Sequence, residues 1–204
     1  GGFGEVLLGR KDSALKSSQG KFDLYSDYEA DIKVLWEGEN RLGDSISYKT
    51  PKLNGFQFAA TYVAEDAADA DAATSFTASY GDGKLKKGKW YAALAIDSEV
   101  DGHDITRVTV GTKVAGVKLG LMHQTQEDLE TGVEESGSFV SAAYGVGKNV
   151  FKAQYQTMED DSALTLGVDR KLGKKTKAYV WYTSFDFESK EDKSYLALGL
   201  EHKF

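Results

Sequence analysis

Apolar residues recur at every second position through most of the chain. In the segment 56–63, Phe56, Phe58 and Tyr62 alternate with Gln57, Thr61 and other residues of the opposite phase. The same period of two is found around Trp90, Phe151 and Leu196. Because successive side chains of a strand point to opposite faces, the pattern predicts β-strands with one apolar face.

Twelve segments carry this pattern, so the sequence predicts an all-β protein built on an antiparallel sheet. The segments are residues 4–9, 41–50, 56–63, 74–81, 89–97, 105–114, 117–126, 138–146, 150–157, 162–172, 176–186 and 194–204. Residues 25–36 are the only stretch with a possible helical period. The longest connection between two predicted strands is residues 10–40.

The face opposite the apolar one carries mostly Ser, Thr, Gln, Gly and Ala. A soluble antiparallel sheet normally exposes charged residues there. Mean hydropathy is −0.43, and no run approaches the roughly 18 apolar residues of a membrane-spanning helix. A transmembrane β-barrel remains, because its lipid-facing residues alternate with lumen-facing polar ones.

Composition excludes several kinds of site. The chain has no cysteine and a net charge of −7, which excludes disulfides and thiolate metal sites and disfavours nucleic-acid binding. His103, His123 and His202 are isolated in sequence, and the run Asp66, Asp69, Asp71 lacks the glycine and glutamate of a calcium loop. We therefore expect no enzyme, no metal and no cofactor.

Charge is sorted between alternate connections. The set 64–73, 97–104, 127–137, 158–161 and 186–193 holds 20 of the chain's 32 carboxylates. The other set is rich in Lys and Arg, with Asp82 as its single acid, and has aromatics close by. If the strands run up and down, one rim is acidic with longer loops and the other is basic with short turns. A soluble β-sandwich binding module is the alternative.

The end of the chain carries a recognisable strand. Residues 195–204 read YLALGLEHKF, with Leu196, Leu198 and Leu200 in one phase and Phe204 last. This segment resembles the terminal strand of Gram-negative outer-membrane proteins, which implies that it is read by the barrel-assembly machinery. Residues 2–10 (GFGEVLLGR) and 39–48 (ENRLGDSISY), followed by Pro51 and by Asn54 to Phe56, resemble the general diffusion porins.

The resemblance implies a sixteen-stranded homotrimeric barrel in the bacterial outer membrane, in contact with lipid and lipopolysaccharide. Its implied function is passive diffusion of ions and small hydrophilic solutes. In that family the third external loop folds inward after the fifth strand. Counting twelve strands back from the terminus makes residues 4–9 the fifth strand, so residues 10–40 are the expected constriction loop. Residues 1–204 are then one barrel domain that lacks the first four strands.

Two groups of charged residues are expected to meet at the constriction. The resemblance and the strand phase assign Arg10, Arg41, Lys118 and Lys152 to a basic wall, and Asp23, Asp27, Glu29 and Asp31 to an acidic loop. Asp27 and Asp31 are four apart and would share a face of a helical turn. Asp44 is anomalous, because it falls in the apolar phase of segment 41–50. Either it lies against protein or a bulge shifts the phase.

The acidic rim predicts a preference for cations. Two other kinds of channel or barrel remain open. A substrate-specific sugar channel needs a track of inward aromatics, for which Tyr91, Tyr179 and Trp181 are the only candidates. A surface adhesin barrel would be a closed pore with no conductance.

Overall fold

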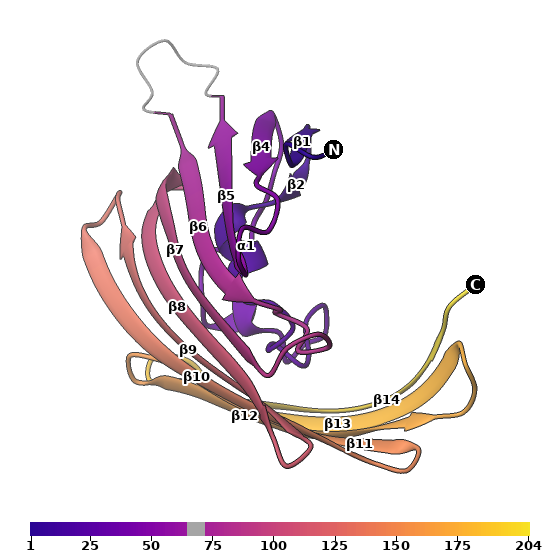
Figure 1. The fold of residues 1–204 in the computed structure, drawn as a ribbon. Helices are drawn as coiled ribbons and strands as arrows, with labels where there is room; N and C mark the ends of the chain where they lie inside the picture. The colour runs from indigo at the N-terminus through magenta and orange to yellow at the C-terminus, as the bar shows by residue number, and fades with distance from the viewer. Residues whose placement is uncertain (65–71) are drawn as a thin grey trace.

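The computed structural model describes residues 1–64 and 72–204, and most of them lie in one curved antiparallel sheet (Figure 1). The predicted acids Glu65, Asp66, Asp69 and Asp71 lie outside the described residues. Twelve strands pair in the order β1-β4-β5-β6-β7-β8-β9-β10-β11-β12-β13-β14. Their bounds are β1 Glu5–Leu8, β4 Ser45–Lys49, β5 Phe56–Val63, β6 Thr74–Gly81, β7 Trp90–Val100, β8 His103–Val114, β9 Val117–Asp128, β10 Val133–Val146, β11 Asn149–Met158, β12 Asp161–Lys171, β13 Thr176–Asp186 and β14 Lys193–His202. The predicted all-β antiparallel fold is confirmed.

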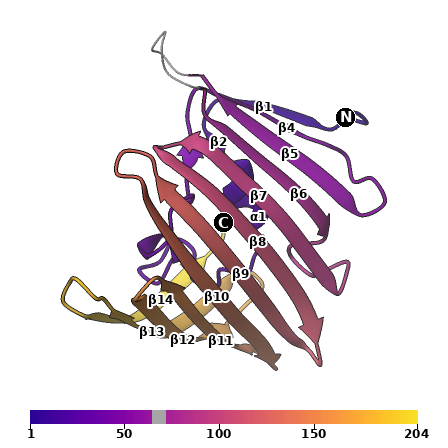
Figure 2. The same ribbon diagram turned by 90° about the vertical axis from the view of Figure 1, so that its left-hand side faces the viewer.

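The two faces of the sheet follow the period of two. On β8 and β9 the outward residues Val108 and Leu121 are 44% and 55% exposed, whereas inward Arg107 and Gln124 are fully buried. Figure 2 shows the strands lying side by side with a common tilt. The apolar residues therefore cover the convex outer surface, as lipid-facing positions of a barrel do.

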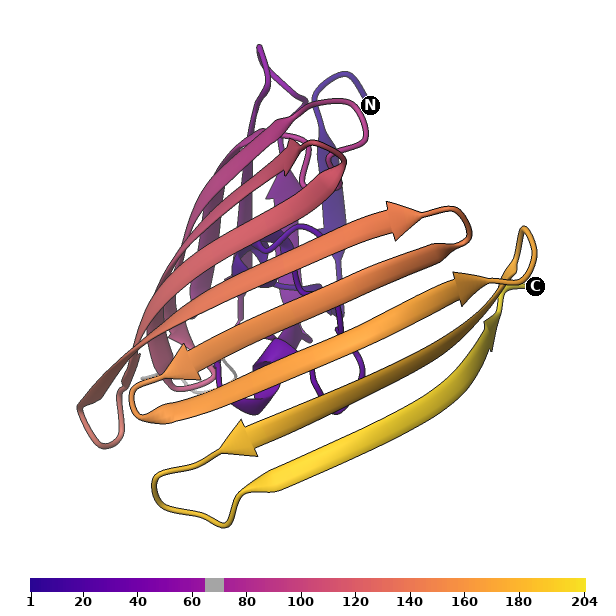
Figure 3. The same ribbon diagram turned by 90° about the horizontal axis from the view of Figure 1, so that it is seen from below.

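The segment between β1 and β4 lies on the concave side of the sheet (Figures 1 and 3). It contains helix α1 (Ala14–Ser18) and a 3-10 turn, η1 (Ile32–Val34). The largest packed cluster joins this segment to the inner wall, with Phe22, Ile32 and Trp36 buried against Tyr91, Met122 and Phe139. The hydrophobic core thus lies between loop and wall, and the inward-folded loop is confirmed.

The predicted strand 41–50 is two pieces. Arg41–Leu42 (β3) pairs with Lys11–Asp12 (β2) in a separate two-stranded sheet, and β4 begins at Ser45. Asp44 lies between them, exposed, with φ of 42°. The break at residues 43–44 resets the phase, so Asp44 does not occupy a lipid-facing strand position. The predicted shift of phase is present, but it comes from a break between β3 and β4 and not from a bulge.

Apart from the long segment 9–44 between β1 and β4, the predicted difference in connection length is wrong for the described connections. The acidic end has residues 101–102, 129–132, 159–160 and 187–192, and the other end has residues 50–55, 82–89, 115–116, 147–148 and 172–175. Strands β7 to β10 continue through the charged segments, where Asp104 and Glu127 are register partners in the sheet. Charged residues at strand tips stay solvated while their backbone remains paired in the sheet. The charged segments therefore do not show where the strands end.

The outward aromatics gather beside the basic turns. The aromatic side chains near these turns and at the end of the chain are all exposed, at Tyr48, Phe56, Tyr80, Trp90, Tyr144, Phe151 and Phe204. The rings of Phe56 and Tyr80, on neighbouring strands, have centroids 5.0 Å apart. Aromatic side chains of this kind suit the lipid–water interface. No helix in residues 1–64 and 72–204 is long and apolar enough to cross a membrane.

Candidate functional site: a loop held against the inner wall

The loop begins with a short helix that is fastened to the wall by hydrogen bonds. Ser13 caps α1, its Oγ accepting from the Lys16 backbone N–H at 2.9 Å. The Thr77 hydroxyl on β6 donates to the Ala14 carbonyl at 2.7 Å. The helix therefore begins at a sequence-encoded cap and lies directly on β6. The predicted helical stretch 25–36 contains only the turn η1, because Asp27 has φ of 69° and interrupts it.

Three loop aromatics sit over glycines of the inner wall. A Cβ on Gly111 or Gly120 would lie 1.8 or 2.6 Å from the Phe22 side chain. A Cβ on Gly167 would lie 2.7 Å from the Tyr25 hydroxyl, and one on Gly137 would lie 3.0 Å from Trp36 Nε1. The distances at Gly111, Gly120 and Gly167 are too short for a Cβ, and at Gly137 a Cβ would lie 2.2 Å from the Thr157 carbonyl oxygen of the wall. The glycines thus form slots that fix the register of loop against wall.

Two predicted wall residues hold the loop directly. Lys118 Nζ donates to the Lys21 carbonyl and lies 4.7 Å from the centre of the Phe22 ring. Lys152 Nζ donates to the Leu24 carbonyl at 3.1 Å and lies 4.5 Å from the Tyr25 ring. Lys152 also pairs with Asp169 at 3.2 Å. Both ammonium groups combine hydrogen bonding with cation–π contact.

Arg107 makes the most buried contact with the loop, and sequence reasoning missed it. Its guanidinium pairs with Glu39 at 2.7 Å and donates to the Glu37 carbonyl at 3.1 Å and to Gln124 at 2.7 Å. Trp36 lies 5.5 Å from it, ring centroid to Cζ. The available signal was its phase on segment 105–114, opposite Val108 and Val110. A charged residue in the middle of a strand on the polar phase is expected to face the inner side of the sheet.

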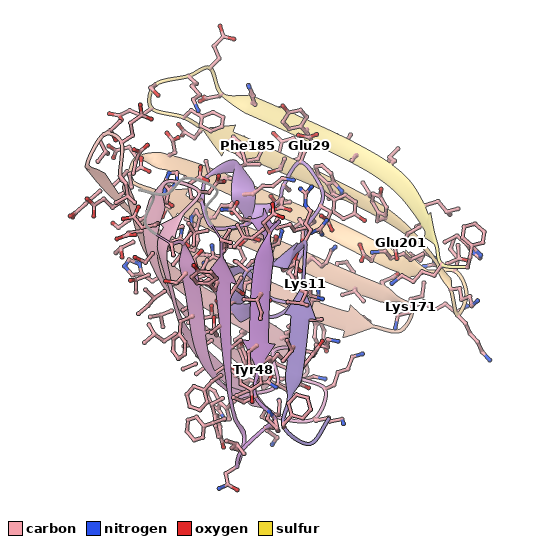
Figure 4. All side chains as sticks on the ribbon, turned by 90° about the horizontal axis from the view of Figure 1, so that it is seen from above. Lys11, Glu29, Tyr48, Lys171, Phe185 and Glu201 are labelled. Atoms are coloured by element: carbon pink, nitrogen blue, oxygen red, sulfur yellow. The ribbon has the colours of Figure 1, made fainter. Side chains whose placement is uncertain are left out.

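The four predicted loop acids divide into two pairs. Asp23 and Asp31 are buried and accept backbone N–H groups of the loop itself: Asp23 from Tyr25 at 2.9 Å, and Asp31 from Asp27 at 2.6 Å and Lys33 at 2.9 Å. Asp27 and Glu29 are exposed. Figure 4 shows Glu29 inside the curve of the sheet. Asp27 and Glu29 are therefore the acids of this set that face open solvent.

Burial changes the acidity of the inner carboxyls. Desolvation, with a contribution from nearby Asp31, raises the pKa of Asp23 to about 7. Desolvation also raises the pKa of Glu39, although the guanidinium of Arg107 opposes the shift. Isolated buried carboxylates are costly to keep charged, so Glu39 depends on its Arg107 partner.

The remaining predicted residues lie away from this contact. Arg10 is exposed between β1 and β2, and Arg41 pairs with Asp12 at 3.0 Å on the β2–β3 ribbon where the loop enters. Leu196, Leu198 and Leu200 are 65–78% exposed on the outward face of β14. Their roles in the eyelet and in assembly stay predictions.

The inner aromatics do not form an open track. Tyr91 and Trp181 face inward, but both are buried against loop residues. Tyr28 of the loop covers Tyr179, with ring centroids 5.2 Å apart. Among the described residues, no group of three or more His, Asp or Glu side chains is arranged to hold a metal ion.

Comparison with known proteins decides the family. The model of the Gram-negative porin family matches residues 1–190. The chain belongs to the Gram-negative porins. A search of curated proteins finds no match. As a member of this family, the protein is a non-enzymatic diffusion channel of the bacterial outer membrane.

Solved porins share the fold at low identity. The anion-selective porin from Comamonas acidovorans is 20% identical with a TM-score of 0.74, over 100% of this chain and 75% of that one. Salmonella typhi OmpF is 12% identical with a TM-score of 0.74, over 98% and 74%. OmpT of Vibrio cholerae, described in a trimer form, is 15% identical with a TM-score of 0.65, over 90% and 67%. This porin thus shares the fold of these solved porins over most of its length and over about two thirds to three quarters of theirs.

Proposed function

We propose that this porin prefers cations and that residues 10–40 are its constriction loop. The supporting observation is that the wall cations in contact with the loop are already engaged. Arg107 is balanced by the carboxylate of Glu39 and Lys152 by that of Asp169, and Lys118 lies against the loop backbone, where it donates to a carbonyl. The carboxylates of Asp27 and Glu29, in contrast, stay exposed.

The acidic end adds a second source of negative potential. A pocket of about 530 Å³ at the tips of β7 to β11 is lined by Asp97, Asp104, Glu127, Glu134, Glu135 and Glu159. Fixed negative charge at a channel mouth raises the local concentration of cations. The acids at the strand tips and the exposed acids of the loop therefore both favour cations, one after the other along the path of the ion.

Planar bilayers test this proposal. With the complete protein in a KCl gradient, we expect a reversal potential on the cation side. The double variant Asp27→Asn/Glu29→Gln should shift it toward zero, and Glu134→Gln/Glu135→Gln should shift it less at high salt, because exposed rim charges are screened over about 10 Å at 0.1 M. A reversal potential on the anion side for the wild-type channel would refute the proposal.

The oligomeric state and the outer partners of the barrel are also part of this proposal. We propose a homotrimer, on the precedent of the Vibrio cholerae porin described as a trimer. The outward leucines of β14 and Phe204 are proposed to be read by the barrel-assembly machinery, and the acidic end to face lipopolysaccharide. Cross-linking in detergent, with and without heating, measures the trimer. A species that migrates as a monomer before heating would contradict it.

A further inference from the structure

A second pocket lies at the basic end of the inner wall. It has a volume of about 300 Å³ and lies between the loop, β4 to β7 and the turn that follows β6. Four lysines line it, from four separate places in the chain: Lys21, Lys49, Lys52 and Lys84. Its other lining side chains include Ser17, Gln57 and Ser79. Lys52 Nζ donates to the Gly81 carbonyl, and the charged side chains of the lining are mostly basic.

Close packing of two glycines brings the loop lysine to the turn lysine. The Lys21 N–H donates to the Gly83 carbonyl at 3.0 Å. A Cβ on Gly20 would lie 2.9 Å from that carbonyl oxygen, and one on Gly83 would lie 3.0 Å from the Gly20 Cα. Lys118 fixes the same point by donating to the Lys21 carbonyl. The backbone of the loop is thus held against the turn, and Lys21 and Lys84 flank the contact.

The one carboxylate lining the pocket is already committed to the backbone. Asp82 accepts N–H groups of Lys84, Lys86 and Lys87, each at 3.0 Å. These bonds hold the pKa of Asp82 at about 2. The carboxylate shapes the turn and stays charged, and one negative charge faces four positive ones among the lining residues. An anion with several charges is the natural complement.

We propose that this pocket binds a small multivalent anion of the phosphate class. Ammonium groups on flexible four-carbon stems are compact point charges that bind phosphate oxygens. The pocket opens on the side of the loop away from the acidic mouth, so an anion from the basic end reaches it without passing that mouth. The site does not depend on the cation preference proposed above.

Inorganic pyrophosphate is the probe. It is added to one side of planar bilayers that hold the complete protein in KCl. We expect it to interrupt the potassium current in a concentration-dependent way, at lower concentration from the basic end than from the acidic end. The variant Lys49→Gln/Lys52→Gln should weaken the block by about tenfold, since each exposed charge contributes only modestly. Its current without pyrophosphate verifies an open channel.

A matched control distinguishes binding of pyrophosphate in the pocket from its general attraction to the basic end of the molecule. Lys174→Gln/Lys175→Gln removes the same charge from the same end of the molecule but outside the pocket. The proposal requires this control to keep wild-type block. Equal weakening in both variants, or the absence of block in the wild-type channel, would overturn it. The reversal potential is measured separately, so the failure of either proposal leaves the other intact.

Discussion

The two faces of the same strands differ in how specific their side chains have to be. On β8 and β9 the outward side offers Val108, Val110 and Leu121, each exposed and interchangeable with other apolar residues. The inward side offers Arg107, Gln124 and Gly120, each matched to one feature of the loop. A lipid-facing surface needs only apolarity, whereas a surface that positions a loop needs particular side chains. Sensitivity to substitution should therefore differ sharply between neighbouring residues.

The largest expected effect comes from Arg107. The substitution Arg107→Ala leaves Glu39 buried without its partner, and such a loss costs about 3–5 kcal/mol. We expect this decrease in the free energy of unfolding, measured by urea titration of the refolded protein in lipid vesicles. The loop should also become sensitive to added protease.

The double variant Arg107→Met/Glu39→Gln is the control for this prediction. It removes both charges and keeps side chains of similar size, so most of the lost stability should return. If Arg107→Ala has the same free energy of unfolding as the wild type, the ion pair between Arg107 and Glu39 does not hold the loop.

The outer face gives the next largest effect. Leu121 is outward on β9, and replacing it with Arg places a charge in lipid at a cost of about 2–4 kcal/mol near the bilayer midplane. The same urea titration in vesicles measures it. Lys148→Arg, in an exposed turn, should change nothing. A cost at Leu121 below that of the turn variant would contradict the assignment of this face to lipid.

This contrast explains how much of the structure was predictable. Outward residues are generic, so alternation alone located all twelve strands of the sheet, and the same phase placed Lys118 and Lys152 on the inner wall. Arg107 was missed because its partner Glu39 lies 68 residues away in sequence. The division of the loop acids into buried and exposed pairs depends on backbone turns such as that at Asp27. The hydrophobic periodicity of the sequence does not indicate such turns.

A smaller effect should come from the glycine slots. Gly120→Ala forces a Cβ to within 2.6 Å of the Phe22 side chain, and overpacking of this kind costs about 1–3 kcal/mol. We expect Phe22 and its neighbours to move off the wall and the single-channel conductance to change. Gly145→Ala on β10 is the matched control, since nothing lies within 4 Å of its added Cβ. Equal conductance in the two variants would show that the slot does not set the loop position.

The smallest effect is confined to the loop and depends on pH. The pKa of Asp23 is about 7 in the docked loop, against an ordinary value of 3.8. Between these values an undocked loop releases a proton that the docked loop retains, so docking weakens as pH rises from about 4 to about 7. Hydrogen exchange of loop amides, corrected for the intrinsic effect of pH, should therefore show greater opening at pH 7.5 than at pH 4.5.

Two variants assign this pH dependence to one carboxyl. Asp23→Asn keeps the acceptor for the Tyr25 N–H but cannot ionise, so most of the dependence should disappear, leaving the part due to Glu39. Asp27→Asn alters an exposed acid whose positive φ asparagine tolerates, and it should retain the wild-type slope. A slope that survives in Asp23→Asn unchanged would mean that the buried face of the loop is not what titrates. The difference in role between the buried acid Asp23 and the exposed acid Asp27 would then have no support from the pH dependence.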